Sequence, residues 1–560
     1  MKIKNISKVT LFSMALSLSL TSCNDWLDLR PNNEQVTDDY WQSKEDVEAV
    51  VASGYYYMRT AVPYVLSWGE LRGGNFYNLG TSLAASKMQD FDMQQSNAMC
   101  DYSKLYQVIS MANSVLDYAP DVQGIDDTYY NAMMQSHLCE AYFQRAWAYS
   151  ILVKNWKEVP LITSAYVNDD AELSVPKASE SEIIAQIKED CMSALATGAA
   201  KATYEEDWQT KSRATKWALY AVMADICLWN HEYDECVKYA DMILNASDAL
   251  RPAFISETSK WFEIFCPGLS NESIFELYWS YADEGSNNNF ASLFPVAGVI
   301  QGSSTGSFNF TQAATDDMIE ETLNVILNSG LSSGRIGRMY LASYYGSSFS
   351  ATSNSVALSS PALWKYRGTE VEDVATVRTS TNNDANFILY RVADVMLMKA
   401  EALVMKGQSS WAEAVGLINQ IRKRAGLAEL ASTDDDIAAM DQVLLLSEVM
   451  HQRSMEFLGE AHRWYDLLRL ARYDKKFAPS GTVEDNEGLT YEAYKSNFGE
   501  DNAQYKNMAM SIIIEANQTT SDDQLKSVLQ NSWSWYLPLP ESDITSSNNV
   551  LVQNPYYKNY

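Results

Sequence analysis

The sequence predicts a mostly α-helical protein in which paired helices support a loop-rich face. Three observations indicate this class. Long segments repeat apolar residues at helical spacing, two such segments continue through a polar turn into a second helix, and stretches rich in Gly, Ser and Asn interrupt them. With 560 residues, the chain is long enough for a large hydrophobic core.

The first long helix is expected over residues 137–156, HLCEAYFQRAWAYSILVKNW. Its apolar side chains recur at helical spacing and form one broad face. The members of that face are Leu138, Ala141, Tyr142, Ala148, Tyr149 and Leu152. A helix with such a face is expected to pack against other helices.

Two segments predict pairs of helices. Residues 213–244 contain a helix, a short polar turn and a second helix, and residues 389–426 repeat this design. In each pair a small residue is followed sixteen positions later by another, as seen at Ala224 and Ala240 and again at Ala400 and Gly416. Small residues let paired helices approach closely, as in tetratricopeptide repeats. Long insertions separate the pairs, so a continuous solenoid is not expected.

A further helical region follows the acidic stretch STDDD at residues 432–436, a composition that favours a helix N-terminus. This region contains EFLGEAHRWYDLLR, with Glu456, Glu460, His462, Arg463 and Asp466. Charges three or four residues apart in a helix commonly form structural ion pairs. The HExxH spacing of a zinc helix is absent. We therefore interpret this cluster as a structural ion-pair lattice.

Irregular stretches separate the helical regions at residues 282–310, 328–383 and 475–531. They are rich in polar and small residues and show no sustained helical period. Long loops on a rigid scaffold commonly carry the binding function. We therefore expect the ligand face to lie in these stretches.

We expect an export signal at the start of the sequence. Lys2, Lys4 and Lys8 precede an apolar run of twelve residues, Val9–Leu20, which is too short to span a bilayer. The following LTSC resembles the lipobox of a bacterial lipoprotein and ends at Cys23. We expect residues 1–22 to be removed and Cys23 to be lipidated, with residues 23–40 as a tether. No later segment is long and apolar enough to cross a membrane.

The composition is strongly acidic. Removing residues 1–22 removes three lysines and no acid, which leaves 39 basic and 72 acidic residues and a net charge of −33. Such a surface repels nucleic acid and anionic lipid headgroups, so neither is expected as a partner. Neutral ligands are unaffected by that field.

No metal site, cofactor or catalytic motif is expected. There are four histidines, and the GxSxG, GxxxxGK[ST] and EF-hand patterns are absent. Six cysteines remain besides Cys23, and their spacing is irregular: Cys100, Cys139, Cys191, Cys227, Cys236 and Cys266. Buried free thiols are the favoured interpretation, while a Cys227–Cys236 disulfide stays open. These observations favour a binding protein over an enzyme.

Several motifs, spread in order over nearly the whole mature chain, resemble the SusD/RagB family of surface nutrient-binding lipoproteins. The similar stretches are DWLDLRP after the lipobox, AYFQRAWAYSILVKNWKEVPLIT, YRVADVMLMKAEALVMKG, RSMEFLGEAHRWYDLLR and YLPLPESDITSSNNVLVQNPYY. The resemblance implies four tetratricopeptide-like helix pairs beneath a loop-rich ligand face. We expect an N-terminal region over residues 41–270 and a C-terminal region over residues 271–560.

The resemblance also implies a partner protein and a cellular location. The partner would be a SusC-like TonB-dependent transporter of the outer membrane, over which the lipid-anchored protein would act as a lid. Most members of this family bind glycans, and some serve peptide uptake. One departure is local, since Gly74 stands where many members carry an acidic residue.

Three stretches combine aromatic and planar polar side chains in loop-like context, as sugar binding requires. The first, WGELRGGNFYNLG, offers Trp68, Glu70, Arg72, Asn75 and Tyr77. The second, YWSYADEGSNNNF, offers Tyr281, Asn288 and Phe290, and LWKYRG offers Trp364 and Arg367. For any single aromatic residue, a place in the core is the favoured interpretation.

The sequence thus predicts a glycan-capturing lipoprotein that delivers oligosaccharides to a transporter. Two alternatives stay open, namely a peptide-binding uptake lipoprotein of the RagB type and a helical-repeat scaffold that binds protein without sugar affinity. Hydrolysis is the weakest hypothesis, because carboxylate pairs for it cannot be identified from sequence spacing.

Overall fold

The computed structural model describes residues 40–78, 80, 82–166, 174–280, 282, 285, 287–294, 307–329, 337–339, 347–350, 355–358, 363–370, 377–379, 382–474, 504–517, 519–548 and 550–558. Ser43–Tyr560 forms one compact unit, and Met1–Gln42 is a separate one. Cys23 lies outside the described residues.

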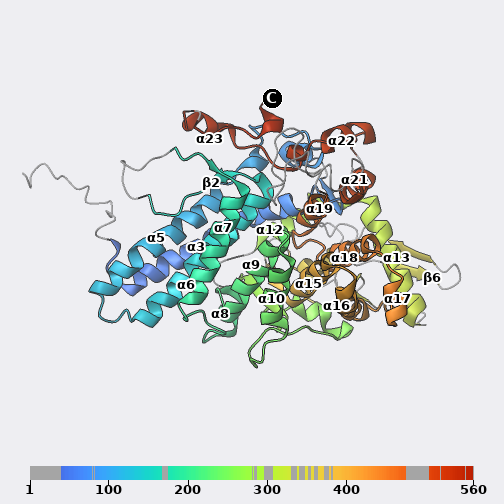
Figure 1. Cartoon of the computed structure of the whole chain (residues 1–560), viewed down its shortest axis with the longest axis horizontal. Helices are drawn as coiled ribbons and strands as arrows, with labels where there is room; N and C mark the ends of the chain where they lie inside the picture. The colour runs from blue at the N-terminus through green and yellow to red at the C-terminus, as the bar shows by residue number, and fades with distance from the viewer. Residues whose placement is uncertain are drawn as a thin grey trace, which may run out of the picture. The chain divides into compact units, whose positions relative to one another are not determined.

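The larger unit is mostly helical, as the sequence predicts (Figure 1). The long helices before residue 250 are α3 (Lys44–Glu70), α5 (Ser103–Ile125), α6 (Asn131–Trp156), α7 (Glu180–Ala196), α9 (Lys216–Trp229) and α10 (Tyr233–Leu244). Those after it are α13 (Gln312–Ser329), α15 (Val392–Lys406), α16 (Trp411–Ala425), α18 (Gln442–Glu456), α19 (Arg463–Arg472) and α21 (Gln504–Ala516). Each long helix up to α16, except α13, packs against the previous one or the one before that.

Shorter helices connect or cover these elements. The short α-helices are α4 (Leu83–Gln89), α8 (Asp207–Ser212), α12 (Asn288–Leu293), α14 (Trp364–Arg367), α17 (Asp434–Ala438), α22 (Asp522–Leu529) and α23 (Glu541–Ser546). The 3₁₀ turns are η1 (Ala98–Cys100), η2 (Thr258–Ile264), η5 (Gln408–Ser410), η7 (Ser532–Trp535) and η8 (Pro555–Tyr557). Among the described residues, no helix is both long and apolar enough to span a membrane.

The described strands form four small antiparallel pairs. These are β1 (Phe76–Asn78) with β5 (Phe308–Phe310), β2 (Val159–Pro160) with β3 (Lys177–Ala178), β4 (Ser273–Leu277) with β8 (Phe387–Arg391), and β6 (Ser347–Ser350) with β7 (Ser355–Leu358). The β4–β8 pair is fully buried, so it joins the two halves of the chain through the core.

Local sequence explains where the helices begin and end. Ser43 and Asp46 form a capping box at the start of α3, and Ser179 and Glu182 form one at the start of α7. Gly426 ends α16 in the left-handed conformation that glycine adopts without strain. One large hydrophobic cluster contains residues from all these helices.

The two predicted helix pairs are present as α9–α10 and α15–α16. Ala224, Ala240 and Ala400 are fully buried, as expected for residues that let helices approach closely. Gly416 differs, because it is exposed and a methyl group added there would meet nothing within 4 Å. Its predicted role in the second pair is therefore wrong, and the buried face of α16 contains Ala414, Val415 and Ile418.

The predicted helical region after residue 432 is divided into α17, α18 and α19. Asp441 begins α18 by accepting a hydrogen bond from the Leu444 N–H at 2.7 Å. A turn then separates α18 from α19, with Gly459 at φ +78° and Ala461 at φ +64°. Glu460 therefore lies in this turn and not one helical turn after Glu456.

A buried cluster of charged side chains surrounds Glu456 at the end of α18. Three guanidinium groups donate to its carboxylate, from Arg424 at 2.6 Å, Arg391 at 2.7 Å and Arg338 at 3.1 Å. Burial would raise the pKa of Glu456, but the three guanidinium groups outweigh it and hold the pKa well below its usual value. The carboxylate is therefore ionised at any pH at which the protein is folded.

Two further acids complete this cluster. Glu460 accepts from Lys365 at 2.6 Å and from Arg391 at 2.9 Å. Glu272, at the edge of β4, accepts from Arg391 at 2.9 Å and also from Arg424. The predicted structural lattice is thus confirmed. The partners of Glu456 and Glu460 come from distant segments, including β8, α14 and α16, whereas Asp466 pairs with Arg469 three residues on in α19.

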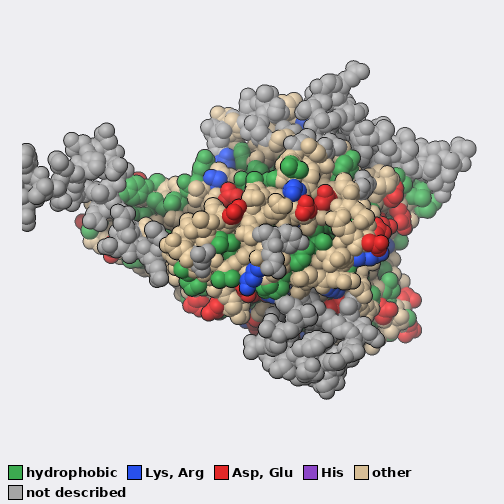
Figure 2. All heavy atoms as spheres, turned by 90° about the horizontal axis from the view of Figure 1, so that it is seen from above, with side chains coloured by type: hydrophobic (Ala, Val, Ile, Leu, Met, Phe, Trp, Pro, Cys, Tyr) green, Lys and Arg blue, Asp and Glu red, His purple; other side chains and the backbone are tan. Residues whose placement is uncertain are grey.

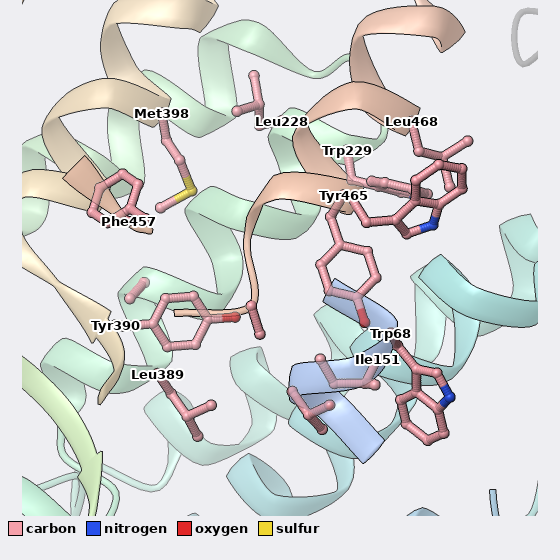
Figure 3. Packing of buried hydrophobic residues seen from close by; sticks show 14 of the residues in the cluster. Trp68, Ile151, Leu228, Trp229, Leu389, Tyr390, Met398, Phe457, Tyr465 and Leu468 are labelled. Carbon is pink, nitrogen blue, oxygen red and sulfur yellow. The ribbon is translucent and has the colours of Figure 1, made fainter. Parts of the chain in front are cut away.

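The segment Trp68–Asn75, proposed from sequence to contact ligand, lies in the interior, where its side chains contact distant parts of the chain. Trp68 is fully buried, packs edge-to-face against Trp156, and donates from its indole N–H to the Met99 carbonyl oxygen at 2.7 Å. Figure 3 shows it within the core beside Ile151. Since both its ring and its N–H are used internally, the role of Trp68 is corrected to a structural one.

Arg72 fixes the C-terminal part of the chain. Its guanidinium donates to the Trp535 carbonyl oxygen and to Asn155 Oδ1, both at 2.9 Å, and lies 4.2 Å from the centre of the Trp464 ring. Burial lowers the pKa of Arg72 to about 10. Its donors therefore serve the fold, which corrects its predicted role as a ligand contact.

Glu70 is a buried carboxyl group at the end of α3. One of its oxygens accepts a hydrogen bond from the Ala461 N–H at 2.7 Å, and the other has no partner. Burial raises the pKa of Glu70 to about 8. Glu70 therefore binds the α18–α19 turn and is not exposed to ligand.

The two glycines of this segment have steric roles. A methyl group at Gly73 would lie 2.5 Å from Arg463 Cγ, and one at Gly74 would lie 2.8 Å from Ala516 Cβ. Gly74 also has φ +86°, which disfavours other residues. Asn75 is buried and exchanges hydrogen bonds with Ser454 at 3.2 Å. Close packing thus explains why no acidic side chain occupies position 74.

We predict that Glu456→Gln lowers stability strongly. The substitution leaves three buried guanidinium groups without their shared negative charge, which typically costs about 3–5 kcal/mol. The urea midpoint of unfolding measures the change. Glu257→Gln is the control, because the Glu257–Lys260 pair is half exposed and such pairs contribute about 0–1 kcal/mol. Equal effects of the two substitutions would contradict the central role of the cluster.

We predict that Glu70→Gln changes how stability depends on pH. The pKa of Glu70 is about 8 in the folded chain, compared with 4.5 for an ordinary glutamate, so the folded state retains this proton more tightly than the unfolded state does. Stability therefore falls as the pH rises between these values, by about 1.4 kcal/mol for each pKa unit. The variant should lack this part of the loss. Urea unfolding of both proteins below and above this interval tests it, and a constant difference between them would refute the assignment.

Candidate functional site

The third predicted stretch also lies in the core, together with part of the second. Phe290 is fully buried and stacks on Tyr366, with ring centres 4.1 Å apart. Trp364 is fully buried and donates to the Glu370 carbonyl oxygen at 2.7 Å. Arg367 donates to the Phe294 carbonyl oxygen at 2.5 Å. Phe290, Trp364 and Arg367 are therefore corrected to structural residues that are brought together in one place.

The remaining predicted residues have different positions. Tyr281 lies outside the described residues. Asn288 begins α12, and its side chain is not described. Tyr77 is half-buried on β1, where it pairs with Asn309. Tyr77 does not line the groove between residues 95–103 and 540–546.

A groove lies between the chain segment before α5 and the segment that contains α23, and we call it the terminal groove. Its larger part has a volume of about 700 Å³ between residues 95–103 and 540–546. A smaller adjoining part of about 250 Å³ is lined by Tyr106, Tyr166 and Leu551 among others. Both parts share Tyr102, Asp543 and Ser546. Figure 2 looks onto the face that carries α23, where uncharged polar surface and hydrophobic patches surround scattered charges.

The first wall is fixed by buried contacts beneath it. The Asn97 side chain accepts from the Met99 N–H at 2.8 Å and donates to the Ala84 carbonyl oxygen at 3.1 Å. Beneath this wall, the Trp68 indole N–H donates to the Met99 carbonyl oxygen. The predicted residue Trp68 thus supports the groove without lining it.

The second wall is tied to the end of α6 and to the first wall. The Trp156 indole N–H donates to the Pro538 carbonyl oxygen at 2.9 Å, and the Leu537 N–H donates to the Asn155 carbonyl oxygen at 2.7 Å. The Glu541 N–H donates to the Gln95 carbonyl oxygen at 3.1 Å. The backbone contact between Glu541 and Gln95 therefore joins the two walls directly.

Tyr102 lies where the two parts of the groove meet. Its side chain is buried, its ring packs edge-to-face on Trp156, and it contacts Tyr106. Its hydroxyl completes no well-aligned hydrogen bond in the chain and lies near Asp543. Burial and, after it, the charge of Asp543 raise the pKa of Tyr102 far above its usual value. The hydroxyl therefore remains protonated and able to donate.

The lining combines the groups that bind polyhydroxylated molecules. Carboxylates come from Asp101, Glu541 and Asp543, and hydroxyls from several serines and Thr545. The amides of Gln95 and Asn97 also line the groove, but their N–H groups donate within the chain. Tyr106 and Tyr166 add aromatic surface. Among the described residues that line the groove none is basic. Across the described part of the chain, no group of three or more His, Cys, Asp and Glu side chains is placed to hold a metal ion.

Sequence reasoning did not select the groove residues. The segment with Tyr102 and Tyr106 has the helical spacing of α5, so its tyrosines resemble ordinary core residues. The α23 segment belongs to the quoted stretch YLPLPESDITSSNNVLVQNPYY, whose polar residues were not assigned a role. The density of Ser, Thr, Asp and Glu at residues 541–547 was the available signal.

The five cysteines of the core are free thiols, as predicted. Cys100, Cys139, Cys191, Cys227 and Cys236 are buried, and Cys266 is partly buried. Burial raises the pKa of Cys227 and Cys236, so both are unreactive thiols. The alternative Cys227–Cys236 disulfide is therefore not formed.

The chain matches two family models. The model described as the SusD family covers residues 276–557, and the model described as starch-binding associating with outer membrane covers residues 25–228. Among curated proteins, a SusD-like protein of Formosa agariphila is 25% identical over 519 residues, which covers 86% of this chain and 95% of that protein. A SusD-like protein of Bacteroides ovatus is 24% identical over 583 residues, covering 96% and 95%.

Solved structures show the same fold. A SusD superfamily protein from Bacteroides thetaiotaomicron has a TM-score of 0.65 at 19% identity, covering 92% of this chain and 99% of that one. A structure described as a laminarin-binding SusD-like protein has a TM-score of 0.63 at 19% identity, covering 92% and 100%. Since one family model spans half of the chain and the whole fold agrees, this chain belongs to the SusD family.

Proposed function

We propose that this protein captures a neutral oligosaccharide in the terminal groove and delivers it to a SusC-like TonB-dependent transporter in the outer membrane. The observation that carries the proposal is the lining of the groove. Aromatic faces at Tyr106 and Tyr166 adjoin a wall that carries several hydroxyls and carboxylates, among them those of Thr545, Glu541 and Asp543. Pyranose rings need an apolar face and paired polar groups of this kind.

The comparisons support glycans as the ligand class. One family model carries the words starch-binding, and one fold neighbour is described as laminarin-binding. The net charge of −30 also favours a neutral ligand over an acidic one. We propose no reaction, because binding and release of an intact glycan need only the contacts of the groove.

We predict that Tyr166→Ala weakens oligosaccharide binding about tenfold, which corresponds to ~1.4 kcal/mol. Tyr166 is 42% exposed, so removal of its ring takes away a stacking face with little effect on the core. Calorimetry against starch and laminarin oligosaccharides measures the change. Tyr130→Ala is the control, because Tyr130 is 67% exposed and does not line the groove. An equal loss in both variants would contradict the groove as the site.

The salt dependence of binding distinguishes a neutral glycan ligand from the peptide alternative. Asp101, Glu541 and Asp543 would attract a basic peptide, and added salt would weaken that attraction. A neutral glycan should bind with nearly the same affinity at low and high salt. Salt-sensitive binding of peptides without glycan binding would replace this proposal with the alternative.

We also propose that Cys23 carries the lipid that holds the protein at the outer membrane, as the LTSC motif indicates. The tether and the partner transporter follow from the same proposal. We predict that Cys23→Ala releases the protein from the membrane fraction and leaves its urea midpoint unchanged, because several acyl chains make attachment effectively permanent. Immunoblotting of separated fractions measures release. Retention of the variant in the membrane fraction would refute this role of Cys23.

A further inference from the structure

A second groove lies at the opposite end of α3 from the terminal groove, and we call it the helix groove. It has a volume of about 340 Å³ and lies between α3, α8 and the residues that follow β4. Trp208 and Tyr56 are the large aromatic side chains at its surface, 41% and 58% exposed. None of the residues proposed from sequence lines it.

The aromatic surface of this groove is held in place. The rings of Trp208 and Tyr278 are stacked, with centres 5.3 Å apart and planes 29° apart. A neighbouring guanidinium, that of Arg59, lies 4.5 Å from the centre of the Trp279 ring. A stacked indole loses little further freedom when a ligand binds to it, so the ordering cost of binding is small.

The polar groups beneath the groove are paired within the chain. The carboxylate of the fully buried Glu140 accepts from Arg213 at 2.9 and 2.7 Å and from the Tyr55 hydroxyl at 2.8 Å. The Tyr55 hydroxyl accepts in turn from the Ala214 N–H at 2.8 Å. The charge of Arg213 is neutralised by Glu140, and the other two charged residues that line the groove, Glu48 and Arg59, are of opposite sign. The groove therefore carries no net charge that would select a charged ligand. Gln209 and Ser212 add neutral polar groups at its side.

We propose that the helix groove is a second carbohydrate site, which takes a neutral pyranose segment against Trp208. The inference rests on the proposed function, since it assigns the same ligand class to another surface. An indole that is stacked on one neighbour, exposed at the surface and flanked by amide and hydroxyl groups is the arrangement that pyranose rings require. A charge-neutral floor favours a neutral glycan over a basic or acidic peptide.

Two sites on one chain have a consequence for long ligands. Both grooves adjoin α3. Tyr56, at the helix groove, and Trp68, beneath the first wall of the terminal groove, are twelve residues apart, or about 18 Å along the helix axis. A polysaccharide that contacts both sites gains from effective concentration, whereas a short oligosaccharide occupies each site separately. The second site should therefore matter more for polymers than for short oligosaccharides.

The test uses the full chain in detergent, with starch and laminarin as polysaccharide probes and their short oligosaccharides. We expect Trp208→Ala to weaken retardation in polysaccharide gels about fivefold to tenfold. We expect the affinity of the remaining site for short oligosaccharides to change less than about twofold, with half the sites lost in calorimetry. Gln209→Ala is a second variant that keeps the stacked rings, and it should reduce retardation in the same direction.

Tyr130→Ala is the matched control and should leave retardation unchanged. The inference is overturned if the wild-type chain binds a polysaccharide and neither Trp208→Ala nor Gln209→Ala weakens retardation. Trp208→Ala could instead unfold normally and yet lose both retardation and short-oligosaccharide binding. That result would assign the binding site to the helix groove alone and overturn the terminal groove as the proposed site. If the wild-type chain binds neither probe nor their oligosaccharides, the proposed function fails together with this inference.

Discussion

The fold depends on one buried electrostatic arrangement, in which Arg391 and Arg424 bind the carboxylates of Glu272, Glu456 and Glu460. Each of these charges would be very unfavourable in the core by itself, and each is stabilised by the others through short hydrogen bonds. Because their elements are β4, β8, α16 and α18, the arrangement forms only when these elements occupy their native positions. It therefore specifies how the helix pairs of the C-terminal half meet the β4–β8 pair.

The same region connects to the terminal groove. The α18–α19 turn that carries Glu460 also presents the Ala461 N–H to Glu70 at the end of α3. From there Trp68 and Arg72 hold the Met99 turn and the Trp535 backbone, which lead into the two walls of the groove. A continuous path of buried contacts thus runs from the charged cluster to the terminal groove.

The sequence predicted the fold class well because helical spacing and capping residues act over short distances. The α9–α10 and α15–α16 pairs, the free thiols and the structural role of the Glu456 cluster could all be inferred in this way. The break between α18 and α19 could not, because the contacts of Glu456 and Glu460 on either side of it are with Arg391, which is distant in sequence.

The site was predicted less well, for a related reason. Trp68, Trp364 and Arg367 occur beside glycines and polar residues, which resembles a loop, and burial by distant segments decides otherwise. Conversely, Tyr102 and Asp543 become neighbours only through tertiary structure, and no local pattern links them. Local composition selects aromatic and polar residue types but cannot indicate which side of the fold they face.

The backbone contacts that close the terminal groove have a consequence for biogenesis. The bond from Trp156 to Pro538 joins residues 382 positions apart, so the second wall can dock only after most of the chain has been synthesised. Contacts of such long range generally form late in folding. The groove is therefore complete only when its last segment has docked against α6.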